Sequence, residues 1–345
     1  MYMKSLLTIS LSLSLATAFV VQGAAKARPR DNVKVSKAHE KYIEGAMAYL
    51  ASKQKADGSW GISGEERRHP IAITGYTLMA LLAGGNLPGE GLHGEAVKKG
   101  MNFLLGQLGK DGIYGNRATG QYMYEHGVAT IALAELYGQT RDKKLKDGVE
   151  RAIKLIIASQ NPQGGWRYRP VARDADISVT VLQVVALRAA KNGGIDVPKR
   201  TIDRAVKYVK ACYHSGSGGF SYQPGSSPGY ARTAAAIYSL QVCGLYEDEM
   251  VKKGSMYLEK NHHTNHSWYV YGNFYASPAQ YMIGGKTWER WYKLMADSLV
   301  KMVKSDGKTY YWAQHARGGV GPIYTTAVFA STLAMPYHYV PLYQR

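Results

Sequence analysis

The chain has 345 residues, with 43 Lys and Arg against 25 Asp and Glu, which gives a formal net charge of +18. Hydrophobic residues make up 46% of the sequence, enough to bury a core, so a wholly disordered chain is excluded. Only two cysteines are present, which excludes a disulfide-stapled scaffold and a Cys-rich zinc or iron–sulfur site.

The first 25 residues have the pattern of a secretory signal peptide. Lys4 gives a positive start, an apolar or hydroxylated stretch runs from Leu6 to Val21, and small residues follow at 23–25. We therefore expect residues 1–25 to be removed and residues 26–345 to be exported to the periplasm or the extracellular space. An uncleaved membrane anchor is the alternative, because basic residues follow the apolar stretch. The small residues at the expected cleavage point favour removal.

The rest of the chain is built from a repeat. Gly-rich turns that end in an aromatic residue recur at spacings of 54, 52 and 54 residues, followed by two weaker copies. The aromatic residues of the first five copies are Trp60, Tyr114, Trp166, Phe220 and Trp268, and the sixth copy offers Tyr310, Tyr311 and Trp312. This period is close to those of stacked helical repeats.

Each turn lies between an amphipathic helix and a nearly all-apolar helix that is rich in small residues. In chain order, the apolar helices are expected at 73–83, 127–137, 179–190, 233–243 and 325–334. This alternation predicts an outer ring of helices around an inner ring. Six units with no polar capping repeat favour closure into an all-α (α/α)6 toroid, formed by 26–345 as one domain, over an open solenoid.

The turns resemble the QW motif of the terpenoid-cyclase and protein-prenyltransferase superfamily. Gln54 to Gly61 matches the form Q-x-x-D-G-S-W-G, and Gln107 to Gly115 and Gln160 to Trp166 are looser copies. Tyr124 to Thr130 and the tail from Tyr324 are similar to secreted bacterial prenyltransferase/squalene-oxidase repeat proteins. The resemblance implies the toroid fold and leaves the activity open. In physical terms, the Gln satisfies loop backbone groups, the glycines permit the turn, and the ring packs between hairpins.

In a toroid of this kind, the starts of the inner helices meet at one opening. Counting in the same register predicts that polar and aromatic side chains from successive units line a Tyr-rich central cavity there. The first row is Tyr124, Asp176 and Tyr230, the second row is His126, Ser178 and Arg232, and the last units add Tyr271, Tyr275 and Tyr324. Glu125 and Asp174 flank these rows as further candidates for ligand binding.

Asp174-Ala175-Asp176-Ile177 is similar to the Asp-x-Asp-Asp box of squalene–hopene-type cyclases, with Ile177 in place of the last Asp. The resemblance implies that Asp176 stands where a protonated acid attacks an alkene, which requires a raised pKa. The alternative, which we favour, is that Asp176 caps the N-terminus of its inner helix.

Two further candidates each have a functional and a structural interpretation. His126 is either a general base or ligand donor that pairs with Glu125 or Tyr124, or a histidine at a helix start that bonds to a neighbouring turn. Arg232 either recognises a carboxylate, phosphate or sulfate, or forms an ion pair with an aspartate of the preceding hairpin.

We expect neither a metal nor a cofactor. The Asp-x-Cys of the prenyltransferase zinc site does not occur in the sequence. His262, His263 and His266 form a small cluster that favours a solvated loop over a metal site. The basic exterior favours anionic partners of the cell envelope, such as a membrane surface or an acidic polysaccharide. No nucleic-acid motif is present, so nucleic acid is not expected as a partner.

The sequence thus predicts an exported toroid that binds an isoprenoid-like or anionic ligand in its central cavity, without demonstrated catalysis. One alternative is a diverged squalene- or terpene-cyclase-like isomerase that uses Asp176 as its acid. The other is a lyase or hydrolase of acidic polysaccharide that uses Tyr124, His126 and Arg232.

Overall fold

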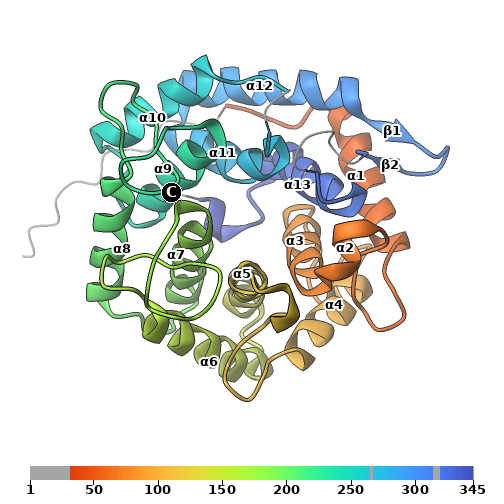
Figure 1. The fold of residues 1–345 in the computed structure, drawn as a ribbon. Helices are drawn as coiled ribbons and strands as arrows, with labels where there is room; N and C mark the ends of the chain where they lie inside the picture. Colours follow the sequence, from red (N-terminus) through yellow and green to blue (C-terminus); the bar gives the residue numbers. More distant parts are fainter. Residues whose placement is uncertain (1–31, 265–266, 314–318, 345) are drawn as a thin grey trace, which may run out of the picture.

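The computed structural model describes residues 32–264, 267–313 and 319–344. The predicted signal peptide, residues 1–25, lies outside this part of the chain. The described residues form two concentric rings of helices (Figure 1). No helix among them is long and apolar enough to cross a lipid bilayer.

The inner ring consists of six helices, each of which packs against the next, and the last packs against the first. These helices are α3 (Pro70–Ala83), α5 (Met123–Thr140), α7 (Ile177–Asn192), α9 (Tyr230–Val242), α11 (Tyr269–Ile283) and α13 (Pro322–Ala334). Nearly every side chain of an inner helix is buried, as the apolar segments predict. The closed contact between α13 and α3 confirms the prediction of an all-α (α/α)6 toroid.

The outer ring consists of amphipathic helices that lie in the grooves between neighbouring inner helices. They are α1 (Lys37–Ser52), α4 (Gly94–Gly106), α6 (Lys143–Ser159), α8 (Lys199–Ala211), α10 (Glu249–Lys260) and α12 (Gly285–Met302). The remaining elements are short: α2 (Gly64–Arg68), η1 (Arg117–Thr119), η2 (Met335–Tyr337), η3 (Pro341–Tyr343), and an antiparallel pair, β1 (Lys304–Ser305) and β2 (Tyr310–Tyr311).

Two of the QW-like turns connect their hairpin to the next one through a glutamine side chain. The Gln54 side-chain amide donates to the carbonyl of Gly58 within its own turn and to the carbonyl of Ala96 on α4, both at 2.9 Å. Gln160 makes the same pair of bonds, to Gly164 in its turn and to Thr201 on α8. The predicted role of the glutamine is confirmed, and it extends to the neighbouring outer helix.

A second repeated bond fixes four of the turns to their own inner helices. The backbone N–H of the repeat aromatic donates to a hydroxyl one turn inside that helix, at 2.8–3.1 Å. The pairs are Trp60 with Thr74, Trp166 with Thr180, Phe220 with Thr233, and Trp312 with Thr326. A buried N–H without an acceptor is costly, so the threonine is part of the repeat.

The ring is closed by contacts between the two ends of the chain. Glu66 of α2 is buried, and its Oε1 accepts the first N–H groups of α13, from Ile323 at 2.7 Å and Tyr324 at 3.1 Å. After α13 the chain turns at His338, whose φ is 63°, and its last residues enter the ring (Figure 1). There the Leu342 N–H donates to the carboxyl of buried Glu135 at 3.3 Å.

Candidate functional site

Inner helices alternate with outer helices that run the opposite way, so all six inner N-termini lie on one face of the ring. We call this face the mouth. At the mouth, Asp176 is the N-cap of α7, and its Oδ1 accepts the N–H of Val179 at 2.9 Å. The capping role is therefore present in the structure, and it uses one carboxylate oxygen of a fully buried side chain.

Arg167, a residue that the sequence did not single out, holds the two aspartates of the Asp-x-Asp sequence together. Its Nη1 donates to Asp174 Oδ2 at 2.6 Å, and its Nε lies 3.4 Å from Asp176 Oδ2. The expected ion pair between an aspartate and Arg232 is therefore wrong, because Arg167, next to the repeat aromatic Trp166, is the partner.

Tyrosines from several units surround this ion pair. The hydroxyls of Tyr168 and Tyr222 lie 2.6 Å apart, and the Arg167 guanidinium lies over both rings, at 5.0 and 5.9 Å from their centroids. Tyr124 stacks on Tyr168 with 6.0 Å between centroids. Tyr168 and Tyr222 each lie two residues after a repeat aromatic, a repeat signal that could have identified them from the sequence.

Two other candidates link the helices that form the mouth. The Tyr271 hydroxyl, on α11, donates to the backbone carbonyl of Ser178 on α7 at 2.9 Å. Tyr124 and Ser178 are half-buried in the first turns of α5 and α7. We refer to Arg167, Asp174, Asp176 and the tyrosines 124, 168, 222 and 271 as the mouth cluster.

Burial changes the proton affinity of the acid in this cluster. Desolvation raises the pKa of Asp176 to about 6, although the Val179 N–H and the Arg167 charge both favour the ionised form. Burial also raises the pKa of Tyr124 well above its usual value. The Tyr124 hydroxyl is therefore neutral at physiological pH and available as a hydrogen-bond donor.

His126 does not face the mouth. Its Nδ1 accepts the N–H of Tyr114 at 3.2 Å, and its Nε2 lies 3.3 Å from the carbonyl of Ala152 on the outer helix α6. This is the role that Thr180 has in the next unit, so the register that paired His126 with Ser178 is wrong by two residues. Burial lowers the pKa of His126 to about 4, which keeps the ring neutral with its proton on Nε2.

The remaining polar candidates lie outside the mouth cluster. Buried Glu125 accepts the N–H of Asn116, and its Oε1 lies 3.1 Å from His69 Nδ1. Arg232 donates to the carbonyl of Ser227 at 2.9 Å. The Tyr230 hydroxyl donates to Asn273, also within the helix layer.

The centre of the ring is packed with aromatic side chains. Tyr76 makes edge contacts with Phe274 and Tyr324, each at 4.8 Å between centroids, and Tyr275 makes one with Tyr271 at 5.0 Å. Tyr275 and Tyr324 are buried in these contacts. The predicted Tyr-rich centre is present, but its rings contact one another where the sequence predicted a cavity.

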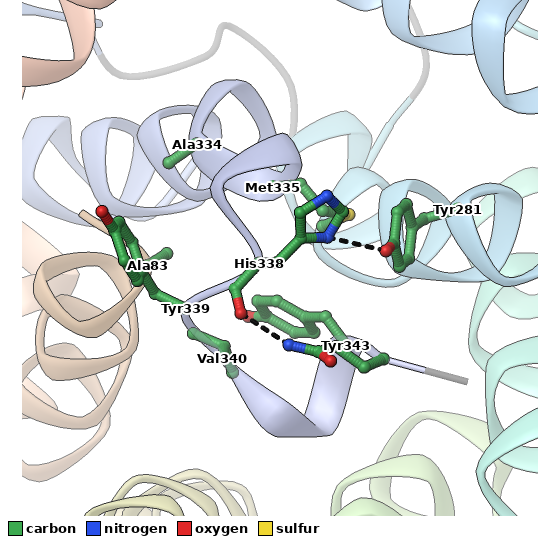
Figure 2. Close-up of a pocket in the computed structure, with 9 residues that line it drawn as sticks. Ala83, Tyr281, Ala334, Met335, His338, Tyr339, Val340 and Tyr343 are labelled. Atoms are coloured by element: carbon green, nitrogen blue, oxygen red, sulfur yellow. Dashed lines mark hydrogen bonds between the residues drawn. The ribbon is translucent and has the colours of Figure 1, made fainter. Parts of the chain in front are cut away.

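The opposite end of the ring is covered by the C-terminal tail. Figure 2 shows the tail crossing between α3 and α11, with His338 Nδ1 at 2.8 Å from the Tyr281 hydroxyl. A pocket of about 10 Å³ lies beside it, lined by Ala83, Met335 and Tyr343 among others. That volume suits no more than a single water molecule, so this pocket is too small for an organic ligand.

The histidine cluster does not form a metal site in the part of the chain that the structure describes. His262 is half-buried, and its ring makes edge contacts with Tyr269 and Trp291, while His263 is exposed. His266 lies outside the described residues. Across residues 32–264, 267–313 and 319–344, no group of three or more His, Cys, Asp or Glu side chains is placed to hold a metal ion.

Solved structures share this fold at low sequence identity. An inactive variant of the α-1,6-mannanase GH76A of Salegentibacter sp. HEL1_6, in complex with α-1,6-mannotriose, is 8% identical and superposes with a TM-score of 0.65 over 87% of this chain and 99% of its own. Cellobiose 2-epimerase from Bacillus thermoamylovorans B4167 is 12% identical, with a TM-score of 0.64 over 87% and 100%.

The type II terpene cyclase MstE from Scytonema, in complex with geranylgeranyl dihydroxybenzoate, is 14% identical, with a TM-score of 0.58 over 88% of this chain and 98% of its own. At these identities the likeness shows the toroid fold alone. No curated protein matches the chain in sequence. The model of the family described as a domain of unknown function, DUF6288, matches residues 39–295, and the chain therefore belongs to that family.

Proposed function

We propose that the protein is an exported α/α toroid that binds an oligosaccharide across its mouth. The observation that carries this proposal is the mouth cluster, in which accessible donors, acceptors and aromatic rings lie together. Side-chain exposure is 26% for Arg167 and 58% for Asp174, and the rings of Tyr124, Tyr168 and Tyr222 are half-buried beside them. A few fixed polar groups among aromatic rings is the usual composition of a small-ligand site.

The chemistry of the cluster suits a sugar. Sugar hydroxyls both donate and accept, so Asp174 provides an acceptor and Arg167 a planar donor. Tyrosine rings present an apolar face to the C–H side of a pyranose and a hydroxyl to its edge. Asp176 is inaccessible, so it acts as a positioning residue that orients Arg167.

The ligand is expected to lie across the mouth and not to enter the ring, because the centre is packed with side chains. Tyr76, Tyr275 and Tyr324 occupy the axis, and the tail covers the far end. The mannanase bound to mannotriose illustrates that this fold can accommodate an oligosaccharide, and both carbohydrate-active neighbours superpose better than the terpene cyclase.

A diverged cyclase remains the second candidate, because burial raises the pKa of Asp176 to about 6. Two observations weigh against it: one Asp176 oxygen accepts the Val179 N–H, and the other lies beside Arg167. The lyase alternative loses its basis, since His126 bonds toward the outer ring and Arg232 bonds to Ser227.

The test is a calorimetric titration of the purified protein with α-1,6-mannotriose, cellotriose and trigalacturonate. We expect one of these trisaccharides to bind, and Arg167→Ala to weaken its binding by about tenfold or more, the loss of one charge-assisted hydrogen bond. The matched control is Arg290→Ala, which removes an exposed ion pair with Glu259 on the outer ring. Lack of binding by all three, together with cyclisation of a geranylgeranyl substrate that Asp176→Asn abolishes, would establish the cyclase instead.

Export rests on the N-terminal pattern of residues 1–25 and is part of the same proposal. The strongly basic composition supports an anionic envelope surface or an acidic polysaccharide as the wider partner. Mass mapping of the N-terminus of protein recovered from the cell envelope tests it: a first residue near position 26 supports export, and a retained Lys4 contradicts cleavage.

A further inference from the structure

Trp268 differs in solvent exposure from the aromatic residues of the other five turns. The aromatic residue of the turn is buried in the other five units, at Trp60, Tyr114, Trp166, Phe220 and Trp312. In the fifth unit, the Trp268 side chain is 58% exposed. The chain has six tryptophans, and the other five are all buried, so Trp268 is its one exposed tryptophan.

In the first two units, a glycine on the next outer helix makes room for the repeat aromatic. A Cβ at Gly100, the seventh residue of α4, would lie 2.7 Å from the ring of Trp60. A Cβ at Gly148 of α6 would lie 2.9 Å from the hydroxyl of Tyr114. The ring therefore occupies the volume that a side chain at the glycine would need.

In the fifth unit, the outer helix that follows the turn carries a large side chain instead. The seventh residue of α12 is Trp291, which is buried and packs edge-on against His262 at 5.1 Å. Tyr269, also buried, packs against the same His262 ring at 5.6 Å. Trp268 directly precedes α11, whereas the loop of residues 167–176 separates Trp166 from α7, so Trp268 does not take the position that its counterparts hold.

The backbone of Trp268 holds the ring outward at the mouth. Trp268 is the N-cap of α11, in the place that Asp176 occupies on α7, and its φ is 64°. The left-handed region is unfavourable for a bulky residue other than glycine, and such conformations concentrate at functional sites. Tyr271, three residues further on, reaches Ser178 of α7, so Trp268 and the mouth cluster belong to one face.

We propose that Trp268 is a stacking platform for a pyranose ring, and that it forms a second subsite for the oligosaccharide whose other end contacts Arg167. This inference rests on the proposed function. Indole offers the largest flat apolar surface of any side chain together with an N–H donor, which suits a sugar face with hydroxyls at its edge. The exposed residues before it, Ser267 and His263, are polar, as expected for a subsite that is wet at its rim.

Because Trp268 is the one exposed tryptophan, acrylamide quenching of intrinsic fluorescence reports on it selectively. The probes are α-1,6-mannotriose, cellotriose and trigalacturonate. We expect the trisaccharide that binds in calorimetry to shift the emission to shorter wavelength and to reduce the quenching of Trp268. Trp268→Phe provides the baseline with no exposed tryptophan and keeps part of the stacking surface.

Calorimetry on variants completes the test. We expect Trp268→Ala to weaken binding by about tenfold and Trp268→Phe by less, with the melting temperature unchanged. The matched control is Met256→Ala on α10, a residue that is 59% exposed, which should leave binding unchanged. If a trisaccharide binds and depends on Arg167, yet Trp268→Ala binds it equally well, the subsite is refuted and the proposed function stands. If no trisaccharide binds, both are refuted.

Discussion

Glu135 offers the sharpest test of the way the tail is held inside the ring. Its side chain is buried on α5, and its one hydrogen-bonded partner in the described part of the chain is the Leu342 N–H of the tail. Desolvation raises the pKa of Glu135 to about 7 from its usual 4.5. Between these two pH values, the folded state holds a proton that the unfolded chain has released.

Because the folded-state pKa lies above the unfolded value, the stability contributed by this group is complete below about pH 4.5 and is lost as pH rises through 7. A difference of two to three pKa units corresponds to about 3 kcal/mol. Glu135→Gln keeps an acceptor for Leu342 and removes the charge. The variant should therefore match the natural protein at pH 4.5 and be more stable than it by about 3 kcal/mol at pH 8.

The assay is urea unfolding of both proteins at pH 4.5, 6 and 8, with the difference in unfolding free energy taken at each pH. The control is Glu289→Gln, the same substitution at an exposed position on α12, measured at the same three pH values. A Glu135→Gln difference that is constant across the three pH values, or a variant that is less stable at pH 8, would refute the assignment of Glu135 as a buried acid.

Substitutions at three further positions test the packing of the ring. Glu66→Ala leaves the first N–H groups of α13 without their acceptor, so we expect the free energy of unfolding, measured with urea, to fall by about 3 kcal/mol. An unchanged midpoint would mean that this carboxyl does not hold α13 in the closed ring. Thr180→Val removes the acceptor of the buried Trp166 N–H at nearly constant volume, with an expected cost of about 1–3 kcal/mol, whereas Thr180→Ser should cost less. Tyr343→Ala should lower stability by about 3 kcal/mol and speed hydrogen exchange at Leu342; exchange that stays slow would contradict the insertion of the tail.

Much of the architecture could be predicted because the same motif occurs several times in the sequence at a regular spacing. In the first turn, Gln54 bonds to the loop backbone and the Trp60 indole bonds to the preceding outer helix. The regular spacing indicates that similar turns follow along the chain. The site residues were harder to place because a fixed period ignores loop lengths. The turn aromatic and its acceptor on the inner helix are 14 residues apart in the first unit but 12 apart at Tyr114 and His126. Because of this shorter spacing, His126 is the acceptor of the turn and does not face the mouth.

Arg167 shows a second limit of the sequence. It lies seven residues before Asp174 and nine before Asp176, and nothing in its local context distinguishes it from the other arginines of the same loop. Only the folded loop brings its guanidinium between two carboxylates and over the rings of Tyr168 and Tyr222.

The sequence by itself determined the ring, because the alternation of amphipathic and apolar helices is a local property, and it identified five of the six inner helices. The tertiary structure decided what fills the ring and what faces solvent at its mouth. Tyr76 contacts Phe274 and Tyr324, the tail contacts Glu135, and Trp291 contacts His262, and in each case the partners come from different units. In a close-packed interior, the volume open to one side chain is set by the side chains around it, and these neighbours are distant in the sequence.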